Sequence, residues 1–595
     1  MLGFLTSQNR LGLTNRETID FFDNFSFLCQ KQILEALSPI LWTEDRIVSF
    51  GQCRHRHSVA WLSRTVTILF LQYFCFGTDV SIFRNAAVIS GMTLLSRITG
   101  LIRDILIARV FGVSGDTDAY YVAFRLPNLL RRLFAEGAFQ QAFVPMLADV
   151  RSTRSPHEAK SFIDKVASLL AFVVLVVSIL GVLAAPVLVW VIASGLTEEP
   201  TTFDTAVQLT RYMFPYIFFM SMVALSSSIL NTWKHFAIPA AVPILLNLSL
   251  ITATLFIAPH LERPIFALAI GVMSGGFLQL FVQIPQLVKL GLFPRFINPI
   301  TAAKDPSVRR VLKLMVPSLF FVVFAQISIL INTNIASFLQ EGSVTWLAYA
   351  DRLMEFPTAL LGVALGTVLL PSLSAAFSKG LKERYNALLD WGLKLVAAFA
   401  IPAAIGLAML GEGLVAVLFQ SARFNANDVF QTSTAVLGYS SGLIGLIGIK
   451  ILAPGFYAQK DIKTPVKIAC TALVVTQIFN LINVPLFSHA GLALSVGMGA
   501  CFNAGVLMLT LRKRGVFTPL AGWKKLFIAI FVGAALLVVY LGVIQHYVVW
   551  TELTCAWILK VALILAVVVG AAVLYLGTLA AFGYRISDLK VSEVD

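Results

Sequence analysis

The sequence predicts an all-α polytopic membrane protein of about fourteen transmembrane helices. The 595-residue chain is 58% hydrophobic and 13% charged, and its mean hydropathy is +0.84, whereas soluble domains are about half apolar and a quarter charged. Apolar runs of about 20 residues, enough to cross a hydrocarbon core about 30 Å thick, recur from residue 84 to residue 583. The expected spans are residues 84–110, 117–149, 161–193, 205–231, 237–258, 265–290, 308–339, 344–377, 384–419, 428–457, 465–487, 490–511, 525–546 and 554–583.

The connections between these spans alternate in charge. Connections such as 151–160 and 512–524 are rich in Lys and Arg, whereas the intervening ones, such as 194–204 and 420–427, are short and poor in them. Cytoplasmic loops carry the excess of Lys and Arg in membrane proteins. An even number of spans with both termini in the cytoplasm keeps this alternation in register.

A weak internal repeat divides the chain. AFRLPNLLRRLFAEGAFQQAFVPML at 123–147 aligns with ADRLMEFPTALLGVALGTVLLPSL at 350–373, so that Arg125 meets Arg352. Because the offset spans six helices, the halves are expected to have the same orientation. We therefore expect two pseudo-symmetric six-helix lobes and two further C-terminal helices. The domains are an N-lobe at 81–303 (helices 1–6), a C-lobe at 304–515 (helices 7–12), and helices 13–14 with a cytoplasmic tail at 516–595.

Residues 1–80 differ in character and form an N-terminal extension of unknown role. Their one apolar run, at 61–77, is interrupted by Arg64. The run lies too far from the terminus and lacks the cleavage site of a signal peptide. An amphipathic surface segment, an extra helix, and upstream sequence joined to a shorter natural protein all stay open.

Several function classes are disfavoured. The six cysteines form no CxxC pair, so neither a disulfide framework nor a metal site is expected. The net charge of +14 is accompanied by no nucleic-acid-binding motif, so no nucleic acid partner is expected. The chain has no GxxxxGK[ST] motif for ATP, and we expect no cofactor.

Charged residues inside the expected spans are the informative feature, because each costs about 2.5–3.5 kcal/mol at the centre of a membrane helix. Such side chains should face a wet cavity or a partner. They occur in the first, second and eighth spans: Arg97, Arg103 and Asp104; Asp118, Arg125, Arg131, Arg132 and Glu136; and Asp351, Arg352 and Glu355. They therefore point to a polar site between the two lobes.

Helical geometry arranges these charges. A spacing of seven residues returns nearly to the same face, which aligns Asp118 with Arg125 and Arg132. Arg103 points about 120° away from Arg97 at about 100° per residue. Either the helix bends, for example at Gly100, so that both reach one cavity, or one of them faces a neighbouring helix.

Guanidinium groups suit phosphate because their planar fork binds two oxygens and stays charged. Several arginines in one wet cavity therefore indicate a site for an anionic head group, such as a diphosphate. The alternative is that these arginines reach the interface or neutralise nearby carboxylates, which fits Arg132 with Glu136 and Arg352 with Glu355.

Four segments carry a resemblance to a known family: SRITGLIRD at 96–104, TDAYYVAFRLPNLLRRLFAEGAFQQAFVP at 117–145, ADRLMEFPTALLGVALGTVLLPSL at 350–373 and LAPGFYAQKDIKTPVKIA at 452–469. Together they resemble the MurJ (MviN) lipid II flippases of the multidrug/oligosaccharidyl-lipid/polysaccharide exporter superfamily, from about residue 81 onward. The resemblance implies two lobes around a cationic cavity and a groove at the last two helices for the undecaprenyl tail. It implies substrate-binding roles for Arg97, Arg103, Arg131, Arg352 and Asp118, and more weakly for Asn128, Glu136, Asp351 and Glu355.

The resemblance implies a lipid II flippase of the bacterial inner membrane, which is a transporter and not an enzyme. It would move undecaprenyl-diphosphate-linked disaccharide-pentapeptide to the periplasmic leaflet by alternating access, for peptidoglycan biosynthesis, cell wall biogenesis and cell shape. Expected partners are lipid II and membrane lipids, with proteins of cell-wall synthesis or division as further candidates. The coupling ion and the oligomeric state stay open.

Four alternatives remain, one of which, a scaffold protein of the division machinery, would leave the buried arginines unexplained. Another polysaccharide-lipid flippase would share the fold, and a drug antiporter of the same superfamily would carry carboxylates for a cationic substrate. A membrane glycosyltransferase would need a carboxylate base and a large outward domain, whereas the outward loops are only a handful to a dozen residues long.

Overall fold

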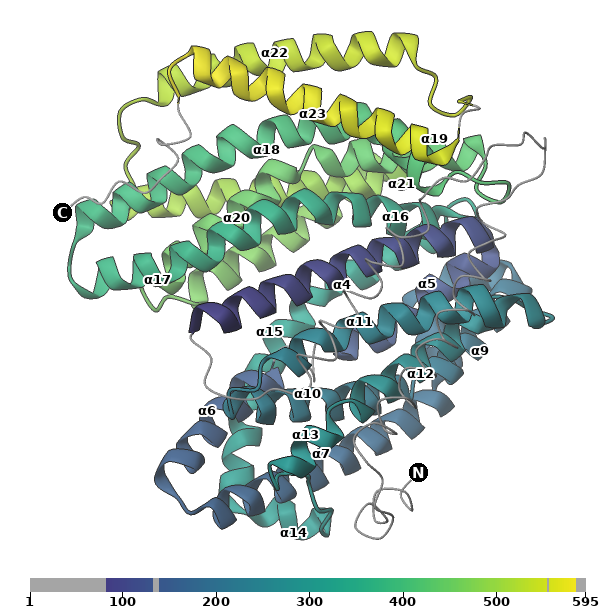
Figure 1. Cartoon of the computed structure of the whole chain (residues 1–595), viewed down its shortest axis with the longest axis vertical. Helices are drawn as coiled ribbons and strands as arrows, with labels where there is room; N and C mark the ends of the chain where they lie inside the picture. Colours follow the sequence, from purple (N-terminus) through teal and green to yellow (C-terminus); the bar gives the residue numbers. More distant parts are fainter. Residues whose placement is uncertain (1–81, 132–137, 554–555, 585–595) are drawn as a thin grey trace, which may run out of the picture. The chain divides into compact units, whose positions relative to one another are not determined.

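The computed structural model describes residues 82–131, 138–553 and 556–584, and every element in these ranges is a helix (Figure 1). Within them, nine helical segments are long and apolar enough to cross a membrane by length and composition. An all-α, multi-span fold class is therefore confirmed, and the count of fourteen spans stays a prediction. The N-terminal extension at 1–80, Arg132 and Glu136 lie outside the described residues.

The first half of the described chain contains eleven of the α-helices that Figure 1 labels by number. They are α4 Ile82–Phe111, α5 Gly115–Arg131, α6 Ala138–Thr153, α7 Pro156–Leu183, α8 Ala185–Ile192, α9 Pro200–Met213, α10 Tyr216–Thr232, α11 Ala237–Thr252, α12 Phe266–Phe281, α13 Ile284–Lys289 and α14 Pro299–Lys304. Short turns of other helix types follow α8 and α11: η2 Ser194–Glu198, η3 Ala253–Ile257 and η4 Ala258–His260.

The second half begins with one long helix. Its elements are α15 Pro306–Ser337, α16 Ser343–Pro357, η5 Thr358–Val363, α17 Ala364–Ser378, α18 Lys382–Phe419, α19 Ala426–Ser440, α20 Leu443–Tyr457, α21 Lys463–Lys513, α22 Trp523–Tyr547 and α23 Trp557–Ala581. Every expected span thus has a helical counterpart among these elements.

Several expected spans are built from two helices instead of one. The span expected at 205–231 is divided between α9 and α10, which meet at Pro215, and that at 161–193 between α7 and α8, with Pro186 in the first turn of α8. A proline has no N–H for the preceding turn, so the helix is interrupted there. Conversely, the spans at 465–487 and 490–511 run on as α21, and only Ser488, with φ 51° and ψ −132°, leaves the helical conformation.

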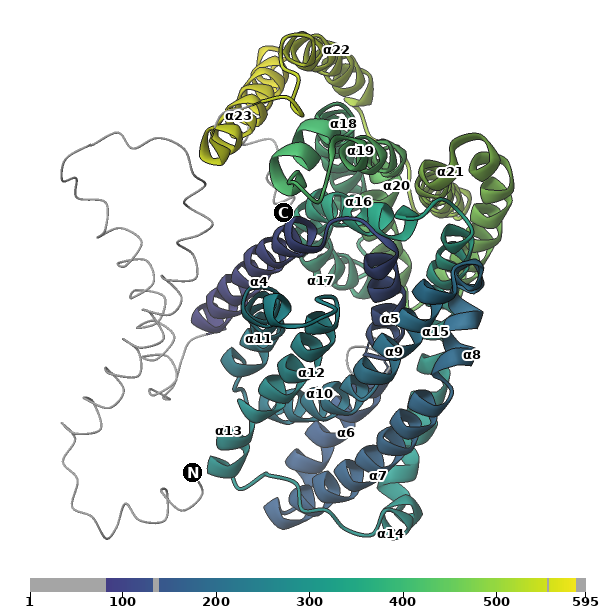
Figure 2. The ribbon, with the colours of Figure 1, turned by 90° about the vertical axis from the view of Figure 1, so that its right-hand side faces the viewer.

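Packing groups most of the helices by sequence half. In the first half, α5 packs on α9, α10 packs on α7 and α12, and α11 packs on α12. In the second half, α18 packs on α17, α19 and α20, and α21 packs on α19 and α20. The long helix α15 contacts both groups, through α6 and α21. Figure 2 shows the same grouping from the side.

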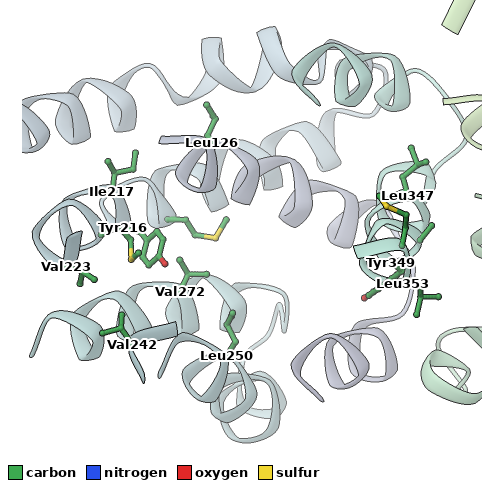
Figure 3. Close-up of a cluster of buried hydrophobic side chains, with 14 of the residues drawn as sticks. Leu126, Tyr216, Ile217, Val223, Val242, Leu250, Val272, Leu347, Tyr349 and Leu353 are labelled. Carbon is green, nitrogen blue, oxygen red and sulfur yellow. The ribbon is translucent and has the colours of Figure 1, made fainter. Parts of the chain in front are cut away.

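Buried apolar side chains of both groups belong to one hydrophobic core cluster. Tyr216 and Ile217 of α10 and Val272 of α12 lie in it, as do Leu347 and Tyr349 of α16 (Figure 3). The core therefore runs through both halves of the described chain.

The last two helices, α22 and α23, pack on each other and on α18. Only 11% of the most apolar stretch of α23 is buried inside the protein, although its mean hydropathy is 2.6. Apolar surface left uncovered to this extent is expected only where lipid replaces water. The bilayer is therefore the solvent of this pair.

Asp390 joins α22 to α18. Its carboxylate accepts hydrogen bonds from Trp523 Nε1 at 2.7 Å and from the backbone N–H of Leu520 at 3.1 Å, and it forms an ion pair with Lys394 at 2.7 Å. The Asp390 side chain is only 2% exposed. This buried carboxylate fixes the segment through which the chain enters α22.

We expect Asp390→Ala to lower the free energy of unfolding by about 3 kcal/mol, because three donors lose one buried charged acceptor. Thermal unfolding of the purified protein in detergent would measure the loss. Asp149→Ala, which removes an exposed carboxylate from α6, should change stability by less than about 0.5 kcal/mol. Equal stability of the two variants would contradict the role of Asp390.

Candidate functional site

The centre of the site is one carboxylate that receives two guanidinium groups. Arg103 donates to Asp104 Oδ1 through Nε at 2.8 Å and Nη2 at 2.7 Å. Arg352 Nε lies 2.9 Å from the other oxygen, Oδ2. Because Arg103 and Asp104 belong to α4 and Arg352 belongs to α16, this carboxylate ties the two halves of the chain together.

Asn247 of α11 holds Arg103 from the opposite side. Its Oδ1 accepts from Arg103 Nη1 at 2.9 Å, and its Nδ2 donates to the Ser96 carbonyl at 3.0 Å and to Thr99 Oγ1 at 3.1 Å. The amide therefore uses both of its ends on α4 and fixes the plane of the Arg103 guanidinium. Both views show α4 between α11 and α16 (Figure 1, Figure 2).

Arg352 is the accessible member of the cluster. Its side chain is 45% exposed, whereas that of Asp104 is 8% exposed. Arg352 Nη1 also donates to Glu355 at 2.9 Å, which is the neutralising pair that the alternative interpretation of these arginines named. Asp351 is exposed on the same helix. An anion entering the site would therefore meet Arg352 before it met Arg103.

Arg97 and Arg103 do not reach one point. α4 is continuous through Gly100, Arg103 is buried against α11, and Arg97 is exposed. Of the two arrangements that helical geometry allowed, the structure has the one in which Arg103 faces a neighbouring helix. Arg97 forms no hydrogen bond or ion pair with any residue in the described ranges.

Arg131 and Asn128 interact with each other at the end of α5. Arg131 donates to Asn128 Oδ1 through Nε at 3.0 Å and Nη2 at 2.9 Å. At about 1.5 Å per residue, Arg131 lies about 24 Å along α5 from its start at Gly115, and Arg97 lies about 21 Å along α4 from Phe111. Asp104 lies only about 10 Å from that same end of α4. Arg97 and Arg131 therefore lie at one depth along the helices, and the cluster of Arg103 with Asp104 lies at another.

Asp118 stabilises the start of α16 from α5. Its carboxylate accepts from the backbone N–H of Gly342 at 2.7 Å, and from the N–H and hydroxyl of Thr345 at 2.8 and 2.5 Å. A carboxylate satisfies the unpaired N–H groups of a helix N-terminus and complements its dipole. Asp118 is thus a helix-capping residue between the two halves, and a direct substrate contact for it stays a prediction.

Sequence reasoning missed two residues of this site. Asp104 was recognised as a charge in the first span but not as the shared acceptor, and Asn247 was not considered. The available signal was a single amide in the uncharged, mostly apolar run AVPILLNLSLITATLFIA at 241–258. A buried amide needs partners for both of its ends, and this one contacts residues about 150 positions away.

A separate apolar cavity of about 510 Å³ lies between α18, α20, α21 and α22. Its walls include Leu393, Ile444, Met508 and Trp523, and Arg512 stands at its edge. The resemblance placed a tail-binding groove at the last two helices. The structure places this cavity against α22, with α23 contributing none of its lining residues. Over the described ranges, no three His, Cys, Asp or Glu side chains form a group suited to a metal ion.

Comparison with known proteins identifies related chains. The family model described as lipid II flippase MurJ matches residues 107–567. The chain is 50% identical over 511 residues to the lipid II flippase MurJ of Burkholderia cenocepacia, a match that covers 85% of this chain and 98% of that protein. It is 37% identical over 522 residues to the probable lipid II flippase MurJ of Vibrio cholerae, covering 86% and 98%.

Solved structures agree with these matches. A structure described as lipid II flippase MurJ in an inward closed conformation superposes with a TM-score of 0.70 at 27% identity, covering 83% of this chain and 98% of the other. An inward-facing multidrug transporter of the MATE family superposes with a TM-score of 0.58 at 15% identity, covering 72% and 98%. The second likeness shows a shared fold alone.

We expect Asp118→Asn to lower the free energy of unfolding by about 1–2 kcal/mol, because an amide presents one acceptor and one donor to a helix N-terminus that needs two acceptors. Asp116→Asn is the matched control, since Asp116 lies on the same helix but is 46% exposed. Denaturation of both variants in detergent would test this. A control as unstable as Asp118→Asn would show that capping is not the cause.

Proposed function

Since the chain belongs to the lipid II flippase MurJ family, we propose that it moves lipid II from the cytoplasmic to the periplasmic leaflet of the bacterial inner membrane, supplying peptidoglycan precursor for cell wall biogenesis. The observation that carries this proposal is the carboxylate of Asp104 held between Arg103 and Arg352. Two arginines from different halves of the molecule, paired through a single carboxylate, form a site that a diphosphate can occupy in its place.

A diphosphate can replace the Asp104 carboxylate because the two groups bind arginine in the same way. A carboxylate and a phosphate present similar pairs of oxygens to a guanidinium fork. Arg97 and Arg131, about 10 Å nearer the cytoplasmic side along their helices, would hold the head group during entry. The diphosphate would then take Arg352 before Arg103, because the Arg352 side chain is 45% exposed, and would reach Arg103 as Asp104 is released.

The arginine site does not present bare charge to the membrane. Arg103 and Arg352 are balanced by Asp104 and Glu355. This balance removes the cost of isolated buried charges. The free energy of binding an anion is then the difference between the arginine contacts with phosphate and the arginine contacts with carboxylate. Such a site can release the head group after transport.

Alternating access requires that the two halves separate at one side of the membrane at a time. The contacts of Asp118 with α16 and of Arg423 with the carbonyl of Val110 join the halves at one end of the helices. With cytoplasmic termini, that end is periplasmic. This conformation would then receive substrate from the cytoplasmic side.

The apolar cavity beside α22 suits part of the isoprenoid tail, because its walls are almost entirely hydrocarbon. A drug antiporter is a poorer fit to the polar site, since a cationic drug would be repelled by the exposed guanidinium of Arg352. The protein therefore acts as a transporter for an anionic lipid. Proteins of cell-wall synthesis or division are further candidate partners.

The first test addresses the arginine site. Arg103→Ala and Arg352→Ala should each weaken lipid II binding about 10- to 150-fold, the equivalent of the 1.5–3 kcal/mol that a charged hydrogen bond contributes. Growth complementation of a strain depleted of its own flippase should be lost, and Lys should restore it only in part. Asp104→Asn should bind lipid II at least as tightly as the parent, because a neutral amide does not compete with the diphosphate for the two arginines. The variant should nevertheless fail to complement growth, because no carboxylate then displaces the head group.

Arg514→Ala is the matched control. Arg514 forms an ion pair with Asp461 at 2.7 Å, away from the site. Hydrogen bonds from the Thr464 side chain and from Arg514 lower the pKa of Asp461 to about 2, so this pair is also ionised at neutral pH. Normal binding and growth in Arg103→Ala and Arg352→Ala at matched membrane abundance would refute the site.

The second test addresses orientation. Single cysteines at residues 194–204 and 420–427 should react with a membrane-impermeant thiol reagent added outside, and cysteines at 151–160 should not, because basic loops stay in the cytoplasm. The six native cysteines would first be replaced by serine. Labelling at 151–160 without labelling at 194–204 would contradict the proposed topology and indicate the opposite orientation.

A further inference from the structure

Arg109, near the end of α4, contacts a helix of the other half. Its Nε and Nη2 donate to the carbonyls of Leu418 and Val417, each at 3.2 Å. These carbonyls belong to the last turn of α18, whose final four C=O groups have no partner within the helix. A cation at this position satisfies them and complements the negative end of the helix dipole.

A third helix covers the same contact. The ring of Trp557, at the start of α23, lies 5.0 Å from the guanidinium carbon of Arg109, and its Nε1 donates to the Val417 carbonyl at 2.9 Å. The turn between α22 and α23 is attached to the same helix end, because Gln420 Nε2 donates to the Thr551 carbonyl at 3.0 Å. Arg109 therefore lies where α4, α18 and α23 meet.

The backbone from Arg109 to Gly112 contacts the segment that follows α18. Ser421 Oγ donates to the Arg109 carbonyl at 3.3 Å, and Arg423 donates to the carbonyl of Val110. Gly112 has φ +69°, and a Cβ there would lie 2.2 Å from the Arg423 carbonyl oxygen. This end of α4 thus meets the segment after α18 at backbone contact distance.

The rest of α4 is held loosely. It makes only sparse backbone contact with other helices of the described chain, and many of its side chains are exposed. In the described chain its polar attachments fall in two regions: the cluster of Arg103, Asp104 and Asn247, with the Asn247 hydrogen bonds to Ser96 and Thr99, and the contacts around Arg109. A helix fixed mainly in two such regions can move when the contacts of either one are released.

We propose that Arg109 is a positioning residue that keeps the periplasmic side closed by capping α18 from α4 beneath Trp557 of α23. The proposal rests on the alternating-access function above. Opening the periplasmic side would withdraw Arg109 from α18 and expose the carbonyls of its last turn to water. Because Trp557 belongs to α23, movement of the last two helices would weaken the same contact, which couples this lipid-facing pair to the closure.

The test measures separation of the halves without substrate. Spin labels on Glu198→Cys and Asn427→Cys, exposed positions on η2 and at the start of α19, report the distance across the periplasmic side in a chain otherwise free of cysteine. Arg109→Ala should raise the ratio of long to short distances about tenfold, within the usual range of coupling between sites. Arg109→Lys should restore part of the short population, because an ammonium still complements the helix end but lacks the fork.

Arg263→Ala is the matched control. Arg263 is also at the periplasmic side and lies 5.3 Å from the ring of Phe266, with an ion pair to Asp116 at 3.1 Å. All of these partners belong to its own half, so their loss should leave the distance distribution unchanged. Should Arg109→Ala fail to insert, Trp557→Ala provides the same test, with an expected smaller shift toward long distances and with Trp557→Phe intermediate.

The result separates this proposal from the flippase proposal. An unchanged distribution in Arg109→Ala, or in Trp557→Ala where that variant stands in, would overturn the role of Arg109 while leaving lipid II binding by Arg103 and Arg352 intact. Growth complementation should fall in Arg109→Ala together with the shift in distances and recover in Arg109→Lys. Normal lipid II binding in Arg103→Ala would instead overturn the arginine site and leave the measured distances unaffected.

Discussion

A buried guanidinium group needs an acceptor, and this constraint organises the structure around Asp104. An isolated buried charge costs several kcal/mol, so Arg103 needs an acceptor close by. That acceptor is Asp104, the next residue on the same helix. Because that carboxylate has a second oxygen, it also reaches Arg352 on α16. The carboxylate that neutralises Arg103 on α4 therefore also links the two halves of the molecule.

Two further links between the halves also use charged side chains. Asp118 supplies acceptors to the first N–H groups of α16, and Arg109 supplies donors to the last carbonyls of α18. Helix ends carry unpaired polar groups that water can also satisfy. Separating such a contact exchanges a protein partner for water, whereas separating an apolar interface of equal size would expose hydrocarbon. Polar helix ends are thus suited to joints that must open repeatedly.

Composition and charge patterning predicted much of this architecture, because both depend on local sequence. The apolar runs located the helices, and the i,i+3 spacing of Arg352 and Glu355 predicted a pairing that the structure contains. The break at Ser488 also fell between two expected spans. These features follow from helix length and helical periodicity, which a single sequence reveals.

The contacts across the molecule could not be predicted in this way. Asp104 and Arg352 are 248 positions apart in sequence, and Asp118 and Gly342 are 224 apart. Periodicity defines the face of a helix on which a residue lies but not which helix covers that face. The seven-residue spacing aligned Asp118 with Arg125 on α5, yet the Asp118 carboxylate is used at the start of α16 and not in the arginine cluster.

If Arg103 and Arg352 bind the diphosphate as proposed, the position of Asp104 also accounts for release of the ligand from a site with strong contacts. A phosphate bound by two arginines in a site without a competing anion would gain the full energy of each charged hydrogen bond. In this site the competing carboxylate belongs to the residue next to Arg103, so its effective concentration is high and independent of the substrate concentration. Binding would then gain only the difference between phosphate and carboxylate contacts. The return of Asp104 to both arginines would offset the cost of releasing the head group and would draw α4 and α16 back together.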